Sequence, residues 1–261
     1  MAESLFAMDG DVVPLEELVE LAAHHRIRLV VNEAHATGTI GPNGRGAVAE
    51  AGLEHEVDVI IGTLGKALGS YGAFVACGQG MARPPVKAAR TFIFSTALPP
   101  TAVASALAAL ELLQERPRLV DKLAANASTL RAEFASQGFE VRASRTQTIP
   151  LIVGAPELAM RICDAAISRG VFAEAIPPPT VPQGTSRLRL AVMASYRTEE
   201  LRRAGELLGD AARAVGFDPR TFERAALAAR EPEYVVEDRR PEPCASERAK
   251  AGVFDFEARA A

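Results

Sequence analysis

Two short apolar runs, each passing directly into glycine and polar residues, most constrain how this chain folds. The first is VVNEAHATGTIG at residues 30–41, and the second is VDVIIGTLGKALGSYGAF at residues 57–74. Continuous apolar runs without alternation are typical of strands buried on both faces, as in the parallel sheets of α/β proteins. Because parallel strands end at the same edge of a sheet, we expect the polar residues after the two runs to lie together there.

The remaining periodicity predicts two structural regions and a tail. Strands are predicted at 27–31, 57–64, 73–77 and 92–96, and helices at 14–25, after Pro100 with a break at Pro117, at 156–169 and at 199–215. Further strands are predicted at FEVR (139–142), TIPLIV (148–153), VFAEAI (171–176) and SRLRLAV (186–192). We therefore expect a partial α/β large domain over 1–100, connecting helices over 101–137 and a smaller α+β domain over 138–216. The segment 217–261 is charged and proline-bearing, so partial disorder is expected there.

Composition excludes several classes of function. The formal net charge of −4 argues against a nucleic-acid-binding face, and no apolar run is long enough to span a bilayer. The first residues lack a basic region followed by an apolar one, so we expect a soluble, cytoplasmic protein. The three cysteines form neither a CxxC pair nor a zinc spacing, so no metal site is predicted.

The polar residues at the two strand ends form a chemically specific set. Asn32 and His35 follow the first run, and Thr63 and Lys66 follow the second. An amide, an imidazole, a hydroxyl and an amine at one sheet edge suit pyridoxal phosphate, because its aldehyde forms a Schiff base with a lysine. Taken alone, Lys66 also fits an ordinary surface-loop lysine. The spacing around it is not that of a Walker loop.

The chain resembles the α-oxoamine synthases, fold-type I pyridoxal-phosphate enzymes that join an amino acid to an acyl thioester, mostly with loss of carbon dioxide. The resemblance rests on FAMDGDVVPL, VVNEAHATGTIGPNGRG, TLGKALGSYGAF, FIFSTALPP and PPPTVPQGTSRLRL, which keep the family order from about residue 3 to residue 215. It implies the C-terminal part of the large domain of that fold, followed by its smaller domain. The last stretch is most similar to the branch that makes 8-amino-7-oxononanoate from L-alanine and a pimeloyl thioester in biotin synthesis.

The resemblance also implies roles for individual residues. Lys66 would form the Schiff base and transfer the substrate proton, and His35 would lie near the phenolic oxygen of the cofactor. The hydroxyl of Thr63 would bind the phosphate, Thr96 would reach the phosphate of a neighbouring subunit's cofactor, and Thr180 would lie near the substrate or acyl chain.

Arg189 would bind the amino-acid carboxylate, a task that suits a planar bidentate donor. Strand alternation puts Arg187 and Arg189 on the same face, so their spacing does not choose between them. The implied partners are an amino acid, an acyl-CoA or acyl-carrier thioester, and a second copy of the chain in a homodimer.

The chain departs from the family at several positions. Asn32 stands where the family has an aspartate that pairs with the protonated pyridine nitrogen, and an amide adds no charge there. Ala7 replaces a serine, Pro177 an arginine and Tyr196 a histidine.

The N-terminal portion of the family, with its glycine-rich phosphate turn and stacking histidine, has no counterpart in the sequence. Without it we expect unpaired strand edges and exposed apolar faces. The alternatives are a truncated product, one half of a split enzyme with an N-terminal partner chain, or a non-catalytic homologue. A glycine C-acetyltransferase-like enzyme is a further alternative.

Overall fold

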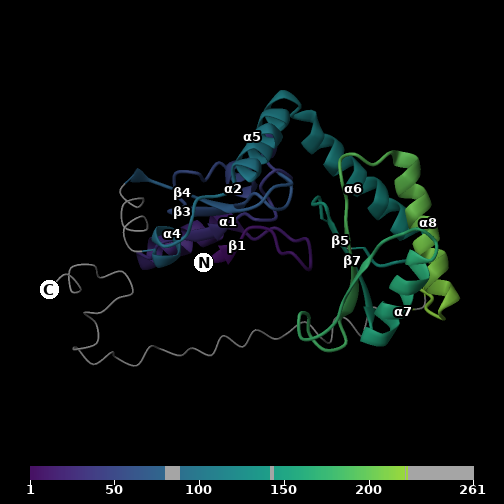
Figure 1. The fold of residues 1–261 in the computed structure, drawn as a ribbon. Coiled ribbons are helices and arrows are strands. Elements are labelled where there is room, and N and C mark those ends of the chain that lie inside the picture. The colour runs from purple at the N-terminus through teal and green to yellow at the C-terminus, as the bar shows by residue number, and fades with distance from the viewer. Residues whose placement is uncertain (80–88, 142–143, 221, 223–261) are drawn as a thin grey trace. The chain divides into compact units, whose positions relative to one another are not determined.

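The computed structural model describes residues 1–79, 89–141, 144–220 and 222. Their elements form a mixed sheet in the first part of the chain and an antiparallel sheet in the second (Figure 1). Each sheet has its own cluster of buried apolar side chains. Apart from 217–220 and 222, the predicted tail lies outside the described residues.

The first sheet has four strands in the order of the chain: β1 (Ala2–Glu3), β2 (Val30–Asn32), β3 (Val59–Thr63) and β4 (Ala73–Cys77). The first three run parallel, and β4 runs antiparallel to β3. Asn32 pairs with Ile61, two residues before β3 ends. The polar residues that follow β2 and β3 therefore leave the sheet at one edge, as the two apolar runs predicted.

Helix α1 (Leu15–His25) buries Leu15 and Ala22 in the core of this sheet. The turn after β2 continues through a 3-10 helix, η1 (Pro42–Gly44), into the short helix α2 (Ala47–Ala51).

Glu33 directly follows β2 and is buried. Its carboxylate reaches the start of α2 and accepts the Val48 N–H at 2.9 Å. Burial raises the pKa of this carboxyl, and the hydrogen bonds oppose that rise. Gly46 leaves the space for it, because a Cβ there would lie 1.6 Å from Glu33 Oε2.

The predicted strand at 92–96 is wrong. Residues Arg90–Ile93 form helix α4, and Phe94 continues it with an N–H bond to the Arg90 carbonyl at 2.9 Å. A short apolar run fits a helix as well as a strand, and only a neighbouring strand edge selects the extended form. The antiparallel partner of β3 is β4, and no strand of the described residues pairs with this segment.

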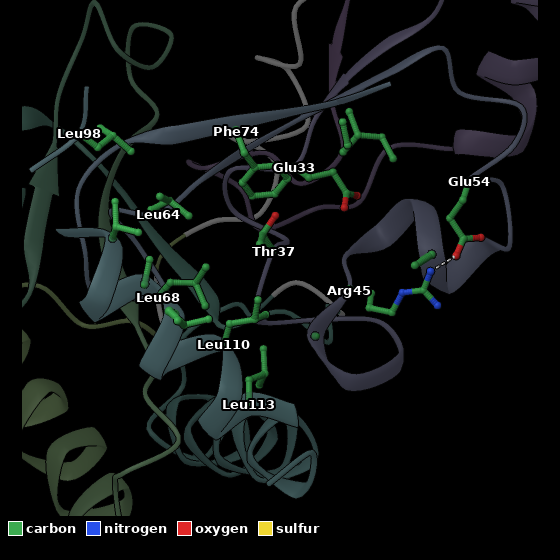
Figure 2. A pocket seen from close by; sticks show the side chains of 17 residues that line it. Glu33, Thr37, Arg45, Glu54, Leu64, Leu68, Phe74, Leu98, Leu110 and Leu113 are labelled. Atoms are coloured by element: carbon green, nitrogen blue, oxygen red, sulfur yellow. Dashed lines mark hydrogen bonds and ion pairs between the residues drawn. The ribbon is translucent and has the colours of Figure 1, made fainter. Parts of the chain in front are cut away.

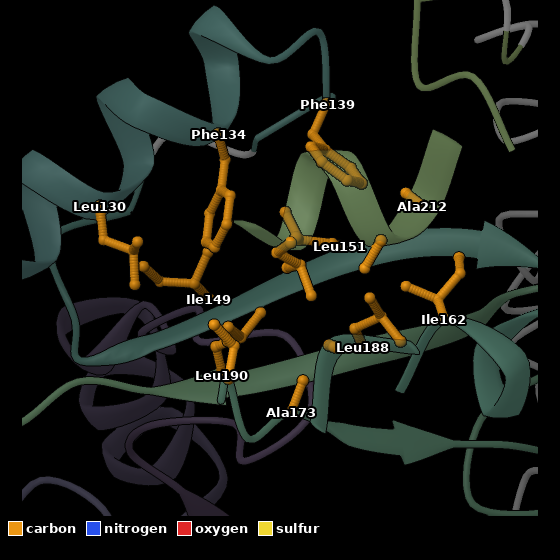
Figure 3. Close-up of a cluster of buried hydrophobic side chains, with 14 of the residues drawn as sticks. Leu130, Phe134, Phe139, Ile149, Leu151, Ile162, Ala173, Leu188, Leu190 and Ala212 are labelled. Carbon is orange, nitrogen blue, oxygen red and sulfur yellow. The ribbon is translucent and has the colours of Figure 1, made fainter. Parts of the chain in front are cut away.

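The predicted break at Pro117 is confirmed, since α5 (Pro100–Glu115) ends before it and α6 (Arg118–Ser136) begins after it. The second sheet joins β5 (Thr148–Gly154), β7 (Ser186–Ala191) and β6 (Glu174–Ile176), all antiparallel, in that spatial order. With α6, helices α7 (Pro156–Ile167) and α8 (Thr198–Ala214) pack on it through a continuous apolar core (Figure 3). Leu151 and Leu188 lie at its centre, fully buried.

The predicted strand at 139–142 is also wrong for the residues described there, Phe139 to Val141. Gly138 is left-handed, with φ of 96°, and the Phe139 N–H bonds to the Phe134 carbonyl at 3.0 Å. The two phenyl rings meet edge to face with centroids 5.8 Å apart. This is the hydrogen bond and apolar contact with which a glycine ends a helix, so Phe139 closes α6 instead of starting a strand.

Apolar side chains remain exposed on β4 and α5, as expected for a sheet of so few strands. Val75 is 60 % exposed and Leu107 is 54 % exposed, and α5 has no buried residue. No helix within the described ranges combines the length and the apolar character that crossing a membrane requires.

Candidate active site

A cavity of about 540 Å³ joins the polar edge of the first sheet to β7 of the second. Ala34 and His35 reach it from the turn after β2, Lys66 from the turn after β3, and Arg189 from β7. Apolar side chains from α5, α6 and the segment after β7 line the rest: Leu112, Leu113, Leu119, Leu123, Val192 and Met193. The cavity therefore has one cationic end and one apolar side.

Lys66 lies in a turn that β3 and β4 hold closed. The Leu64 N–H bonds to the Gly72 carbonyl at 2.9 Å, and the Gly69 N–H bonds to the Lys66 carbonyl at 3.0 Å. Partial burial lowers the pKa of the Lys66 ammonium, the Glu3 carboxylate opposes that shift, and the Arg189 charge adds to it. A lysine with a lowered pKa is a better nucleophile at neutral pH, which is what attack on an aldehyde requires.

His35 is half-buried beside Lys66. Burial lowers the pKa of its imidazole first, and the charges of Lys66 and Arg189 lower it further against the opposing effect of Glu3. The lowered pKa favours the neutral imidazole at pH 7. Its backbone carbonyl accepts two hydrogen bonds, from the Thr39 hydroxyl at 2.8 Å and from Gln147 Nε2 at 2.9 Å.

The structure separates the two arginines that spacing left equivalent. Arg187 has a side chain only 5 % exposed, which pairs with Asp9 and donates from Nε to the Thr185 carbonyl at 3.2 Å. Arg189 lines the cavity instead, and its guanidinium forms an ion pair with Glu174 of β6 at 2.7 Å. Of the two, Arg189 is the one that a ligand in the cavity reaches.

The other predicted site residues lie outside the lining of this cavity. Thr63 uses its hydroxyl within the turn, donating to the Gly72 carbonyl at 3.2 Å and accepting the Gly65 N–H at 3.1 Å. Thr96 follows α4 and Thr180 follows β6, and both are exposed. Asn32 is half-buried at the end of β2, and its side chain accepts the Ala34 N–H.

Two residues that the sequence did not single out belong to this site. Glu3 of β1 pairs in register with Asn32, and its charge acts on both His35 and Lys66. Gln147 lines the cavity and holds the His35 carbonyl. No local signal marks either residue, because β1 has only two residues and Gln147 is distant from His35 in the chain.

A second cavity, of about 590 Å³, lies between the sheet and α5 (Figure 2). It is lined mostly by apolar side chains, among them Leu64, Phe74 and Leu110. Glu33 and Thr37 reach it from the turn after β2, but Glu33 is already bonded to α2. None of Lys66, His35 and Arg189 lines it, so it lacks the groups that the predicted chemistry needs.

The residues at the first cavity fit pyridoxal phosphate in their chemical types. Lys66 supplies an amine with a lowered pKa, the turn at Ala34 and His35 supplies a surface for a flat ring, and Arg189 supplies a cation for a carboxylate. Thr63 is less suited to bind the phosphate, because its single hydroxyl proton already forms a hydrogen bond to the Gly72 carbonyl.

Comparison with known proteins found a matching family and curated relatives. The family described as aminotransferase class I and II matches residues 1–208. The chain is 39% identical over 218 residues to 8-amino-7-oxononanoate synthase of Citrifermentans bemidjiense, covering 83% of this chain and 56% of that protein. It is 45% identical over 196 residues to the synthase of Anaeromyxobacter dehalogenans, covering 75% and 49%. The chain thus spans about half the length of the curated relatives it matches.

Solved structures show the same fold. A serine palmitoyltransferase from S. paucimobilis with a bound PLP–myriocin aldimine has a TM-score of 0.78 and 30% identity, over 82% of this chain and 55% of that one. An 8-amino-7-oxononanoate synthase from Francisella tularensis has a TM-score of 0.71 at 23% identity, over 82% and 62%, a likeness of fold alone.

Proposed function

Because this chain belongs to the aminotransferase class I and II family, we propose that it carries the lysine-bearing part of an α-oxoamine synthase site. The reaction joins an amino acid to an acyl thioester and releases carbon dioxide and the free thiol. The observation that carries the proposal is the convergence of Lys66, His35 and Arg189 on one cavity. Its apolar side offers a place for the acyl group.

Pyridoxal phosphate, when bound, supplies the electron withdrawal that weakens the bonds at the α-carbon of the amino acid. Lys66 would hold the cofactor through its aldehyde, and its Nζ would accept the α-proton of the amino acid. Arg189 would bind the α-carboxylate, and His35 would hold its imidazole beside the cofactor. Gln147, just before β5, donates from Nε2 to the His35 carbonyl and so fixes its backbone.

The finer proposal is an 8-amino-7-oxononanoate synthase that condenses L-alanine with a pimeloyl thioester in biotin synthesis. The stretch PPPTVPQGTSRLRL and the names of the curated relatives support it. The proposal includes a homodimer in the cytoplasm. Glycine and acetyl-CoA are the competing substrates, and the amino acid that exchanges its α-proton with solvent in the presence of the protein distinguishes L-alanine from glycine.

The direct test is covalent capture of the cofactor. The full chain is mixed with pyridoxal phosphate, reduced with borohydride and digested, and the modified peptide is identified by mass spectrometry. The expected result is a pyridoxyl group on Lys66, with Lys122 of α6 as the internal reference for unselective labelling. Equal labelling of the two lysines would contradict the proposal.

The ion pair between Arg189 and Glu174 leads to a prediction about substrate binding. Glu174 already pairs with the Arg189 guanidinium, the group that would bind the amino-acid carboxylate. Both side chains are partly exposed, so their attraction is modest, and Glu174→Gln should tighten L-alanine binding about two- to fivefold. An NMR titration with L-alanine measures this change. Glu206→Gln, which breaks a comparable exposed pair with Arg203 on α8, should leave the affinity unchanged.

A non-catalytic homologue is the alternative that Asn32 favours, since its amide adds no charge beside the cofactor nitrogen. Such a protein still captures the cofactor on Lys66 but leaves the α-proton of every amino acid unexchanged. Proton exchange with L-alanine or glycine by the unaltered chain rejects it.

A further inference from the structure

The 144–147 segment, which directly precedes β5, bonds to the first part of the chain through all four of its side chains. The Ser144 and Thr146 hydroxyls both donate to the Gly10 carbonyl, each at 2.8 Å. Thr146 is only 1 % exposed, so its bond is shielded from water. At Gly10 the backbone is left-handed, with φ of 72°, and a Cβ there would lie 2.5 Å from the Thr148 carbonyl oxygen. The turn at Gly10 therefore packs directly on the start of β5.

Gln147 connects the same segment to the candidate active site. Its Nε2 donates to the His35 carbonyl at 2.9 Å, and its own carbonyl accepts the Val192 N–H at 3.0 Å. Gln147 and Val192 both line the cavity, and so does Arg189 on the strand that ends just before Val192. A single residue thus bridges the turn that bears His35 and the strand that bears Arg189.

The 144–147 segment is also fixed within the second sheet. Arg131 of α6 donates from Nη2 to the Thr146 carbonyl at 2.8 Å and to the Thr148 carbonyl at 2.9 Å. Strand β5 in turn pairs with β7, which carries Arg189. Because these bonds are buried, the segment and β7 should move as one unit.

An amino acid bound in this cavity has to meet groups from both sheets at once. In the proposed function its amino group reacts on the side of Lys66, and its carboxylate binds Arg189 of β7. Lys66 lies in a turn that bonds within the first sheet hold closed, so its own conformation does not depend on the 144–147 segment. The span between Lys66 and Arg189 does depend on it.

We propose that the 144–147 segment positions Arg189 relative to Lys66, so that one amino acid reaches both groups. Thr146 and Gln147 are the positioning residues, and each acts through the backbone carbonyl of the first part of the chain that it binds. This inference rests on the proposed function above. Loosening the segment should therefore weaken amino-acid binding and leave covalent capture of the cofactor unchanged.

Arg187 reaches the same turn of the first part from β7, but through other partners. It pairs with Asp9, and its Nη1 donates to the Met8 carbonyl at 3.5 Å. Its removal leaves the four contacts of the 144–147 segment in place. The loss of Arg187 should consequently lower stability without displacing the carboxylate-binding group.

The test compares L-alanine affinity with cofactor capture in the double variant Thr146→Val/Gln147→Met of the full chain. Valine and methionine nearly keep the volumes of the two side chains but supply no donor. In the cofactor-loaded double variant, L-alanine affinity should be about three- to tenfold weaker, the effect of losing a hydrogen bond on this path. Pyridoxyl labelling of Lys66 should be unchanged. Thr146→Ser, which keeps the hydroxyl, should bind L-alanine as the unaltered chain does.

Thr129→Val is the matched control, because its hydroxyl donates to the Ala125 carbonyl at 3.0 Å within α6 alone. Urea unfolding identifies the conditions in which each variant is folded. Unchanged L-alanine affinity in the folded double variant overturns the inference, and so does a loss of Lys66 labelling there. If the double variant does not fold, Gln147→Met alone is compared in the same way.

The His35 imidazole gives a second measurement, which needs no cofactor. Burial lowers its pKa most, and the charges of Lys66 and Arg189 lower it further against the opposing effect of Glu3. If Arg189 recedes in the double variant, the His35 pKa should rise, whereas Thr129→Val should leave it unchanged. An NMR titration with pH measures this shift, and an unchanged His35 pKa in the double variant contradicts the inference. If Lys66 of the unaltered chain captures no cofactor, the proposed function fails, while this titration still decides the inference.

Discussion

Replacing Lys66 by alanine is expected to abolish covalent capture of pyridoxal phosphate and to slow α-proton exchange by on the order of 10²–10⁴-fold. The amine is both the attachment point and the proton acceptor, and the neighbouring groups identified at the cavity offer no second primary amine. Its side chain is exposed and makes no hydrogen bond within the described residues, so the free energy of unfolding should change by less than about 0.5 kcal/mol.

The matched control is Lys122→Ala, which removes an exposed lysine from α6. Borohydride trapping and α-proton exchange are measured on both variants beside the unaltered chain. Retained trapping in Lys66→Ala, on any other residue, would reject Lys66 as the attachment point. Because the pKa of Lys66 is lowered, trapping in the unaltered chain should also begin at a lower pH than labelling of a free lysine.

The second large effect is expected from replacing Arg187 or Arg189, which lie on one face of β7. One substitution should reduce stability and the other should reduce substrate binding. Arg187→Ala removes a buried cation that joins Asp9 to the second sheet, and should lower the free energy of unfolding by about 3 kcal/mol. Arg189→Ala removes a partly exposed pair, so the corresponding loss should stay within about 1 kcal/mol. Binding of L-alanine should instead be lost in Arg189→Ala.

Urea unfolding and the NMR titration with L-alanine separate these two outcomes. Arg187→Ala should bind L-alanine normally at low temperature, where the fold is intact. If Arg187→Ala loses binding while its stability is unchanged, the roles of the two arginines are reversed.

The fold was predictable wherever a long periodic pattern or an apolar run with a glycine turn marked it. The runs that became β2 and β3 were of this kind, and so was the helix that ends near Pro117. The segments at 92–96 and 139–142 were not, because segments of four or five residues with only two or three apolar side chains fit a helix end as well as a strand. Their structure depends on the neighbours that they meet: Phe139 packs against Phe134, and no strand of the described residues pairs with 92–96.

The candidate site was predictable in its residue types but not in its contacts. Lys66, His35 and Arg189 were each visible in the sequence, and the structure brings them to one cavity. The commitment of the Thr63 hydroxyl to its own turn was not visible, because it depends on the path of the chain through Gly72. Glu3 was hidden for a related reason, since its place beside Asn32 arises from strand pairing across distant segments.

The bond from Gln147 to the His35 carbonyl has a consequence for how mutations in this protein would be read. In a genetic screen for lost activity, a substitution at Gln147 would be found together with substitutions of residues that contact the cofactor, because both reduce activity. The side chain nevertheless acts on the main chain of another residue, so its phenotype should be suppressed by changes that stiffen the 35–39 turn. Suppression by a second mutation would thus distinguish a residue that holds the His35 backbone from one that contacts the cofactor. Loss of activity alone would not distinguish them.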